Sequence, residues 1–133
     1  MKTNQTMKAA AIQIEARVAD LHYNISQAGD FAEKALKAGA RIVALPEFFT
    51  TQIVLDDRLF SASLNKKNNP ALEMLKNLSS RYEATIGGSY LEHDELSGDV
   101  FNTYTLIEPN GTVHRHKKDI PTMAENAFYL GGS

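Results

Sequence analysis

The sequence predicts an α/β fold in the order β-α-β-α-β-β-β. Two segments with helical apolar spacing, 24–38 and 69–82, alternate with short apolar segments. Such alternation is typical of a sheet with at least one face covered by helices. The last third of the chain holds short strand-like segments separated by polar turns. These final segments predict antiparallel hairpins joined to the same sheet.

The first strand and the first helix follow from local patterns. Residues 8–16 predict a buried strand, because they form a short apolar run that ends in charge. Asp20 is suited to cap the following helix. Apolar residues recur at helical spacing over 24–38. Gly39 then stands where a helix ends in a left-handed residue.

The second strand and the second helix are equally marked. Residues 41–45 form a near-continuous apolar run, which suits a strand covered on both faces. Pro46 ends that strand, because proline cannot donate a ladder hydrogen bond. Residues 56–64 are a looser region. Asn69 and Pro70 begin the second helix, with proline at its first position and a leucine stripe behind it.

Three further strands are expected at 85–92, 100–108 and 112–118, separated by turns at 93–99 and 109–111. No linker rich in Pro, Gly or Ser divides the chain. We therefore interpret residues 1–133 as one continuous unit.

Composition narrows the possible functions. Fourteen Lys and Arg stand against 16 Asp and Glu, for a net charge of −2, so no basic excess favours nucleic acid. The 133 residues contain no cysteine, which excludes a disulfide, a thiolate metal site and a cysteine nucleophile within them. No apolar run has the length of a membrane span or a signal-peptide core. We expect a cytoplasmic protein without membrane contact.

Glu47 is the first candidate for chemistry. It directly follows an apolar strand, and catalytic groups of α/β folds favour the carboxyl ends of strands. Phe48 and Phe49 come next and would desolvate the carboxylate. That environment favours the protonated form and lets a glutamate act as a general base near neutral pH. The alternative is a surface glutamate at the start of a loop.

The basic segment 114–119 allows three interpretations. It could be a solvated hairpin strand. His114 and His116 share a strand face and could hold zinc, although no third ligand is evident at a fixed spacing. A lysine near a carboxylate could instead stabilise an oxyanion. Glu125 follows closely and could complete a charged cluster with Glu47 and a lysine.

Together these residues resemble the N-terminal half of the nitrilase superfamily, the carbon–nitrogen hydrolases. The resemblance runs from Lys8 to Gly132. Five pieces carry it in order: the opening strand with Gln13; Asn24 at the first helix; the segment 38–49 ending in Pro46-Glu47-Phe48-Phe49; Gly87-Gly88-Ser89 with Phe101-Asn102-Thr103 and Pro109-Asn110-Gly111; and His116-Lys117-Lys118-Asp119-Ile120-Pro121.

The resemblance implies a four-layer αββα sandwich and a Glu-Lys-Cys triad. Glu47 would be the general base, a lysine would stabilise the tetrahedral intermediate, and Glu125 would hold that lysine. Aligning 116–118 with the family's aromatic-basic-lysine motif gives Lys118, the reading that we favour. Counting back from Pro121 or Glu125 permits Lys117. Only one of the two can face the pocket, because strand side chains alternate.

The sequence departs from the family pattern by lacking the cysteine. We therefore expect an incomplete domain, whose C-terminal half with the nucleophile is absent, and no hydrolysis by this chain alone. The intact enzyme would take a small amide, nitrile or carbamoyl substrate, without a cofactor or metal. Half of a sandwich would expose an apolar sheet face, so we expect a homo-oligomer or a complex with a second-half polypeptide.

Two alternatives differ in class from an enzyme fragment. The chain could be a truncated product that acts by assembly or interaction, or a histidine-based metal-binding module. Phe48, Phe49 and Tyr129 are candidates for substrate-pocket walls, and core packing explains them equally well.

Overall fold

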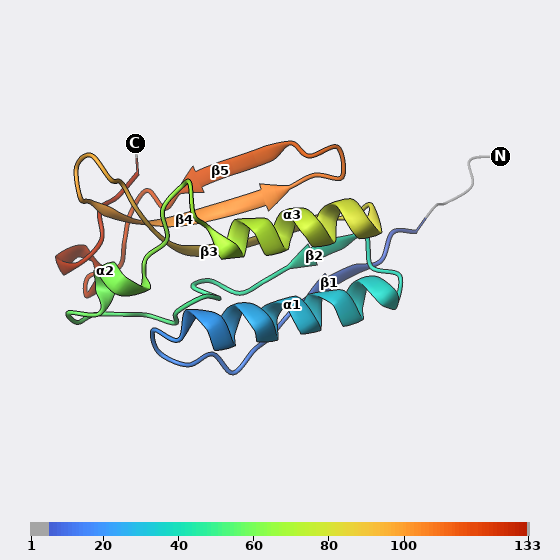
Figure 1. The fold of residues 1–133 in the computed structure, drawn as a ribbon, viewed down its shortest axis with the longest axis horizontal. Helices are drawn as coiled ribbons and strands as arrows, with labels where there is room; N and C mark the ends of the chain where they lie inside the picture. Colours follow the sequence, from blue (N-terminus) through green and yellow to red (C-terminus); the bar gives the residue numbers. More distant parts are fainter. Residues whose placement is uncertain (1–5, 133) are drawn as a thin grey trace.

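The computed structural model describes residues 6–132, so the first five residues and Ser133 of the expected single unit lie outside it. One five-stranded sheet in the order β1-β2-β3-β4-β5 organises the chain (Figure 1). The elements are β1 (Ala9–Ala11), α1 (Leu21–Lys37), β2 (Ile42–Ala44), α2 (Leu59–Ala62), α3 (Pro70–Tyr82), β3 (Thr85–His93), β4 (Val100–Ile107), β5 (Val113–Lys117) and the 3-10 turn η1 (Glu125–Ala127).

The strand directions confirm the predicted architecture. β1, β2 and β3 are parallel, and helices connect them. β4 and β5 add to the sheet as antiparallel hairpins, with Ile86 opposite Ile107 and Ile107 opposite Val113. The result is a mixed sheet, as the alternation of patterns along the sequence predicts.

Both long helices begin at the caps that the sequence marks. The Asp20 side chain accepts a hydrogen bond from the Tyr23 N–H, and Asn69 accepts one from the Leu72 N–H. These bonds satisfy backbone donors that have no partner inside the first turn. α1 begins at Leu21, earlier than the predicted start at 24. The cap decides the boundary, because the helix starts directly after Asp20.

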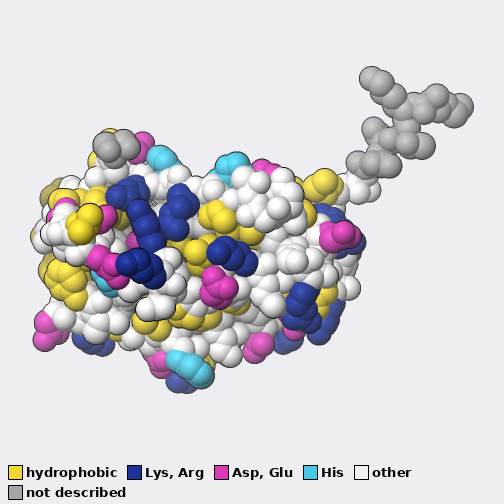
Figure 2. Space-filling view, turned by 45° about the horizontal axis from the view of Figure 1, so that its top comes forward, with side chains coloured by type: hydrophobic (Ala, Val, Ile, Leu, Met, Phe, Trp, Pro, Cys, Tyr) yellow, Lys and Arg dark blue, Asp and Glu magenta, His cyan; other side chains and the backbone are white. Residues whose placement is uncertain are grey.

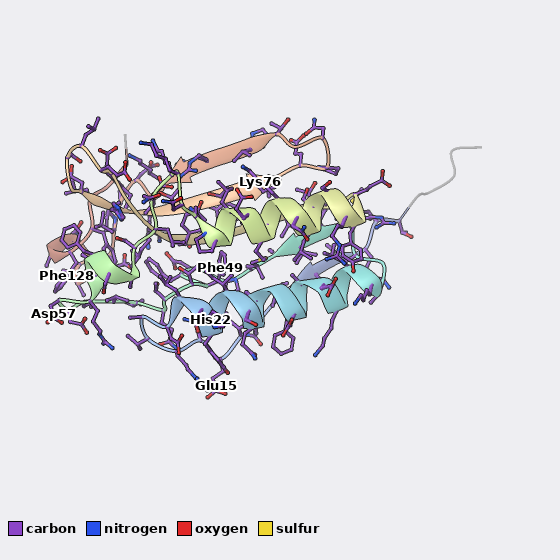
Figure 3. All side chains as sticks on the ribbon, viewed as in Figure 1. Glu15, His22, Phe49, Asp57, Lys76 and Phe128 are labelled. Atoms are coloured by element: carbon purple, nitrogen blue, oxygen red, sulfur yellow. The ribbon has the colours of Figure 1, made fainter. Side chains whose placement is uncertain are left out.

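The two long helices cover the same side of the sheet (Figure 1). Their apolar stripes pack on strand residues that include Val43, Ile86 and Tyr90. Phe49 lies in this layer with no exposed surface (Figure 3). A smaller cluster around Phe48, Val54 and Tyr129 lies near the C-terminal segment.

Among residues 6–132, no helix covers the opposite side of the sheet. Strand alternation places Ala11, Ala44 and Leu106 there in one row of the ladder, with Ile42 and Tyr104 in neighbouring rows. Ile42 is 43% exposed and Tyr104 is 38% exposed. We call these five residues the open face. Only the helix side of the sheet is therefore packed within residues 6–132.

The predicted first strand is too long. Ladder pairing covers only Ala9–Ala11 and not residues 8–16. Ile12 and Ile14 still pack against the core, so their apolar character reflects burial of a non-strand segment. None of the described helices has the length and hydropathy to cross a membrane.

Candidate active site

Three charged side chains from separate parts of the chain meet at one end of the sheet. Glu47 follows β2, Lys118 follows β5, and Glu125 opens η1. The Lys118 Nζ donates to Glu47 Oε1 at 3.0 Å and to Glu125 Oε2 at 3.2 Å. The structure therefore brings together the three residues that the sequence predicted as catalytic. It places one ammonium between two carboxylates.

A short turn after β2 carries Glu47 to this point. The Phe48 N–H donates to Ser89 Oγ at 3.0 Å, and the Phe49 N–H donates to the Ser89 carbonyl at 3.1 Å. Phe48 has a φ of +52°, in the left-handed region that bulky residues rarely occupy. Ser89 of β3 thus fixes the turn through its side chain and its backbone together.

The electrostatics of Lys118 and Glu125 favour their charged forms. The hydrogen bond from Lys118 to Glu47 raises the pKa of Lys118, and this outweighs the opposing effect of burial. Burial alone would raise the pKa of Glu125. The Thr122 N–H and the Lys118 ammonium overcome this and hold the Glu125 pKa below its ordinary value. Lys118 is therefore held as the ammonium and Glu125 as the carboxylate.

One prediction about Glu47 is wrong. The sequence predicts that Phe48 and Phe49 desolvate its carboxylate, yet the Glu47 side chain is 54% exposed. Both rings turn away into the packed layers, where Phe48 is 3% exposed and Phe49 is fully buried. The carboxylate therefore stands on the open side of the sheet.

The two adjacent lysines have different surroundings. Lys118 meets the carboxylates, whereas Lys117 places its Nζ 3.5 Å from the centre of the Phe101 ring. The backbone explains this difference, because Lys117 is the last ladder residue of β5 and successive side chains point to opposite faces. Of the two lysines left open by the motif, Lys118 lies at the carboxylates.

The aromatic residues proposed as pocket walls pack inside the protein. Phe48 and Tyr129 contact each other with ring centres 5.8 Å apart, and Phe49 packs edge-on to Tyr90. The Tyr129 hydroxyl donates to the Val54 carbonyl. Within residues 6–132 these contacts account for all three rings as core residues. Their role in substrate binding stays a prediction.

A cavity of about 330 Å³ lies over the charged residues on the open side of the sheet. It is lined by Glu47, Ser89, Asn102, Tyr104, His116, Lys118 and Asp119. Ser89 and Asn102 had no assigned role in the sequence analysis. Their only signal was their position in two strand motifs. Ser89 bonds to Phe48 across 41 positions of the chain, and Asn102 bonds to Glu47 across 55, so no local window shows either contact.

The two histidines of β5 have carboxylate neighbours. His114 Nε2 lies 2.8 Å from Glu108 Oε1, and His116 Nε2 lies 3.7 Å from Asp119 Oδ1. In the part of the chain that the structure describes, no three His, Cys, Asp or Glu residues gather as metal ligands would. The arrangement gives the metal-binding interpretation no third ligand.

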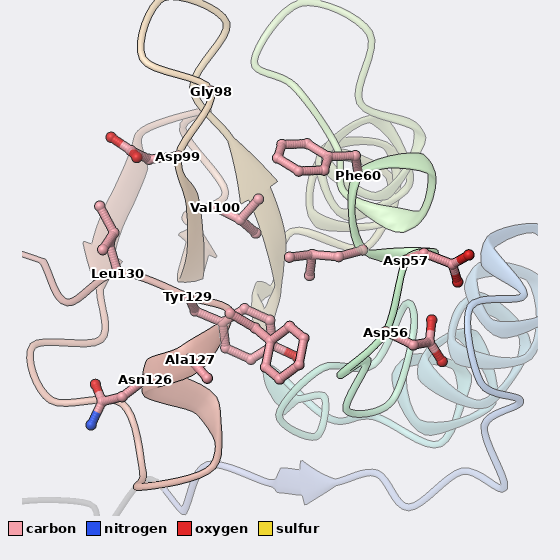
Figure 4. A pocket seen from close by; sticks show the side chains of 12 residues that line it. Asp56, Asp57, Phe60, Gly98, Asp99, Val100, Asn126, Ala127, Tyr129 and Leu130 are labelled. Carbon is pink, nitrogen blue, oxygen red and sulfur yellow. The ribbon is translucent and has the colours of Figure 1, made fainter.

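Other cavities lie away from the three charged residues, and two of them border acidic or basic side chains. One of about 510 Å³ is bordered by Asp57, Phe60 and Asp99, with Phe60 and Leu130 on opposite sides in Figure 4. Another of about 330 Å³ is bordered by Lys66, Arg115 and Lys117. Figure 2 shows Lys and Arg side chains gathered on one part of the visible face. Within the cavity, Arg115 pairs with the buried Glu92.

Comparison with known proteins identifies the family. The family model for carbon-nitrogen hydrolases matches residues 8–129, so the chain belongs to the carbon-nitrogen hydrolase family. It is 27% identical over 121 residues to the omega-amidase NIT3 of Saccharomyces cerevisiae. It is 31% identical over 136 residues to a deaminated glutathione amidase of Synechocystis. Among solved structures, S. cerevisiae Nit3 superposes with a TM-score of 0.83 at 23% identity. XC1258 from Xanthomonas campestris gives 0.81, also at 23% identity.

The matches cover nearly all of this chain but only part of each relative. The alignments span 86% and 93% of this chain, but 42% and 49% of the two curated relatives. The superpositions cover 96% of this chain and 49% of Nit3, and 94% of this chain and 46% of XC1258. The chain therefore spans about half the length of these relatives. It has the nitrilase-like α/β fold over that half, as predicted.

Proposed function

We propose that this chain supplies the general base, the oxyanion-stabilising lysine and the supporting glutamate of an enzyme that hydrolyses nonpeptide carbon–nitrogen bonds. The observation that carries the proposal is the pair of hydrogen bonds from Lys118 Nζ to Glu47 and Glu125. Amidases among the relatives favour a small-molecule amide as the substrate class over a nitrile or a carbamoyl compound.

The geometry supports a division of roles. Glu47 is exposed at the cavity, so its carboxylate can take a proton from a nucleophile there. Lys118 keeps its charge and can stabilise the oxyanion that forms when a thiolate adds to the carbonyl carbon. The proton on Glu47 then passes to the leaving amine, and water releases the acid from the thioester. Glu125 is 4% exposed and holds Lys118 from behind.

The nucleophile of this proposal comes from outside these 133 residues, since they contain no cysteine. A base and an oxyanion site do not replace a covalent nucleophile in this mechanism. We therefore expect the chain alone to release no ammonia from amides. Its domain would be completed by a second polypeptide segment or by another copy packed on the open face.

The apolar open face is the specific observation that favours assembly as part of the function. Ile42 and Tyr104 expose large side chains on one side of the sheet, and the helices of the described residues cover the other side. Apolar surface of this kind marks contact sites. A non-enzymatic assembly protein would share this surface. The enzyme and the non-enzymatic assembly protein are distinguished by whether substitution of Glu47 abolishes hydrolysis.

The first experiment is to sequence the gene through and beyond codon 133. If a cysteine-bearing segment follows, the joined product, or both halves mixed, is assayed for ammonia release from a set of small amides. We expect Glu47→Gln to lower the rate by about 10²–10⁴-fold, and Glu73→Gln, a surface change on α3, to leave it unaltered. Turnover by the pure chain that is lost in Glu47→Gln, or full turnover by the Glu47→Gln complex, would overturn the proposal.

A further inference from the structure

Asn102 forms hydrogen bonds with both Glu47 and Lys118 of the candidate site. Its side-chain amide donates to Glu47 Oε1 at 2.7 Å, and its backbone carbonyl accepts from the Lys118 N–H at 2.8 Å. It lies in β4 and is only 4% exposed. A single strand residue thus joins the turn after β2 to the end of β5.

Hydrogen bonds fix the direction of the Glu47 carboxylate. The Glu47 side chain is 54% exposed, so packing restrains it weakly. The bonds from Asn102 and from Lys118 both end on Oε1. Two donors on one oxygen hold the carboxylate in one orientation and leave the lone pairs of Oε2 for an incoming proton.

The amide has an energetic cost that a structural role does not explain. Asn102 Oδ1 is buried and has no hydrogen-bond partner among residues 6–132. A buried acceptor without a partner destabilises a protein. An apolar residue of the same shape would fill the position without that cost. The hydrogen bond that the Asn102 amide donates to Glu47 is the contribution that offsets the cost of the unpartnered Oδ1.

We propose that Asn102 is a positioning residue that clamps Glu47 Oε1 beside Lys118 and so reserves Oε2 as the atom that accepts the proton. This inference rests on the proposed function, because it names the geometry that the general base requires. Asn102 itself takes no proton and acts through Glu47.

The test follows the titration of the Lys118 ammonium by NMR in the purified chain. Asn102→Leu removes the donor, so Glu47 swings into water and the pKa of Lys118 falls toward its ordinary value. Asn102→Asp keeps the shape but adds a carboxylate, so the pKa of Lys118 rises. Opposite directions in two variants of one residue distinguish positioning from a general loss of structure.

Thr103→Val is the matched control. Thr103 is the next residue of β4, is 1% exposed, and lies on the other face of the strand. We expect this variant to leave the titration of Lys118 unaltered. An unaltered Lys118 pKa in a folded Asn102→Leu variant overturns the inference. If that variant does not fold, an unaltered or lowered pKa in Asn102→Asp overturns it equally.

Enzyme activity provides a second, independent test of the positioning role. In a complex that contains the cysteine-bearing segment, Asn102→Leu should lower kcat by about 10–100-fold, with KM little changed. Failure of the wild-type complex to hydrolyse any amide would count against the proposed function and leave the titration result standing. Full kcat in Asn102→Leu within an active complex would count against the positioning role alone.

Discussion

At the scale of single residues, Lys118 decides the electrostatic character of the site. One ammonium, 29% exposed, serves two carboxylates of different environment: Glu125 is 5% exposed at its side chain and Glu47 is 54% exposed. Removing one partner of a buried pair leaves an uncompensated charge, which costs more than the pair itself contributes. Of the two carboxylates, Glu125 is therefore the one whose removal should lower the free energy of unfolding more.

We expect Glu125→Gln to lower the free energy of unfolding at pH 7 by about 1–3 kcal/mol. The pKa of Glu125 lies below its ordinary value of 4.5 in the folded state, so the unfolded chain binds the proton more readily. Its contribution is complete above about pH 4.5 and is lost as the pH falls through the folded-state value. The difference between wild type and variant, measured by urea unfolding, should therefore shrink below that pH. A difference that stays constant from pH 7 to pH 3 contradicts this explanation.

At the scale of elements, the turn after β2 depends on a close approach between β3 and the buried rings. A Cβ at Gly88 would lie 2.8 Å from both Leu45 Cβ and Phe49 Cδ1. The missing side chain lets Phe49 enter the core while Glu47, two residues earlier, stays at the surface. The packing of β3 against this turn therefore sets where the carboxylate stands.

Gly88→Ala should lower the free energy of unfolding by about 1–3 kcal/mol, because overpacking forces the Phe49 ring or the backbone to move. Gly29→Ala is the control. Gly29 lies in α1, and the added Cβ would sit at an ordinary contact distance of 3.4 Å from Met74 Cγ of α3. Helix propensity then predicts a gain in the free energy of unfolding of up to about 1 kcal/mol. Denaturant unfolding of both variants tests the pair. Equal stability of Gly88→Ala and wild type would show that the turn tolerates the added carbon.

The same elements show what the sequence can predict. The caps Asp20 and Asn69 and the leucine stripe of α3 are local signals, and the structure confirms the helices that they mark. The first strand was overestimated because Ile12 and Ile14 are buried without ladder pairing. The exposure of Glu47 depends on Gly88, which lies far along the chain, so no window around the glutamate contains that information. The residues alone offered a charged cluster of Glu47, a lysine and Glu125 as one possibility, and the motif resemblance gave the three residues their roles.

At the scale of the whole molecule, the sheet has two unequal sides. The helix side holds the core, with Val43, Ile86 and Tyr90 almost fully buried. The open face keeps Ile42 and Tyr104 partly in water, and Tyr104 lines the cavity that contains Glu47 and Lys118. Whatever covers the open face would also bury the charged residues and strengthen their interactions, because a lower dielectric surrounds them. Assembly and catalysis would then be coupled through one surface.

This coupling predicts self-association of the isolated chain. Sedimentation of the pure chain should give a concentration-dependent mass above 14.7 kDa. Ile42→Lys should shift the chain toward monomer, because it places a charge in the apolar open face. Phe60→Lys is the matched control: Phe60 is 61% exposed on α2, outside the open face, and its change should leave association unaltered. If Ile42→Lys and wild type sediment alike, the open face does not mediate association. If Phe60→Lys alone dissociates the chain, contact runs through α2 and the cavity beside it.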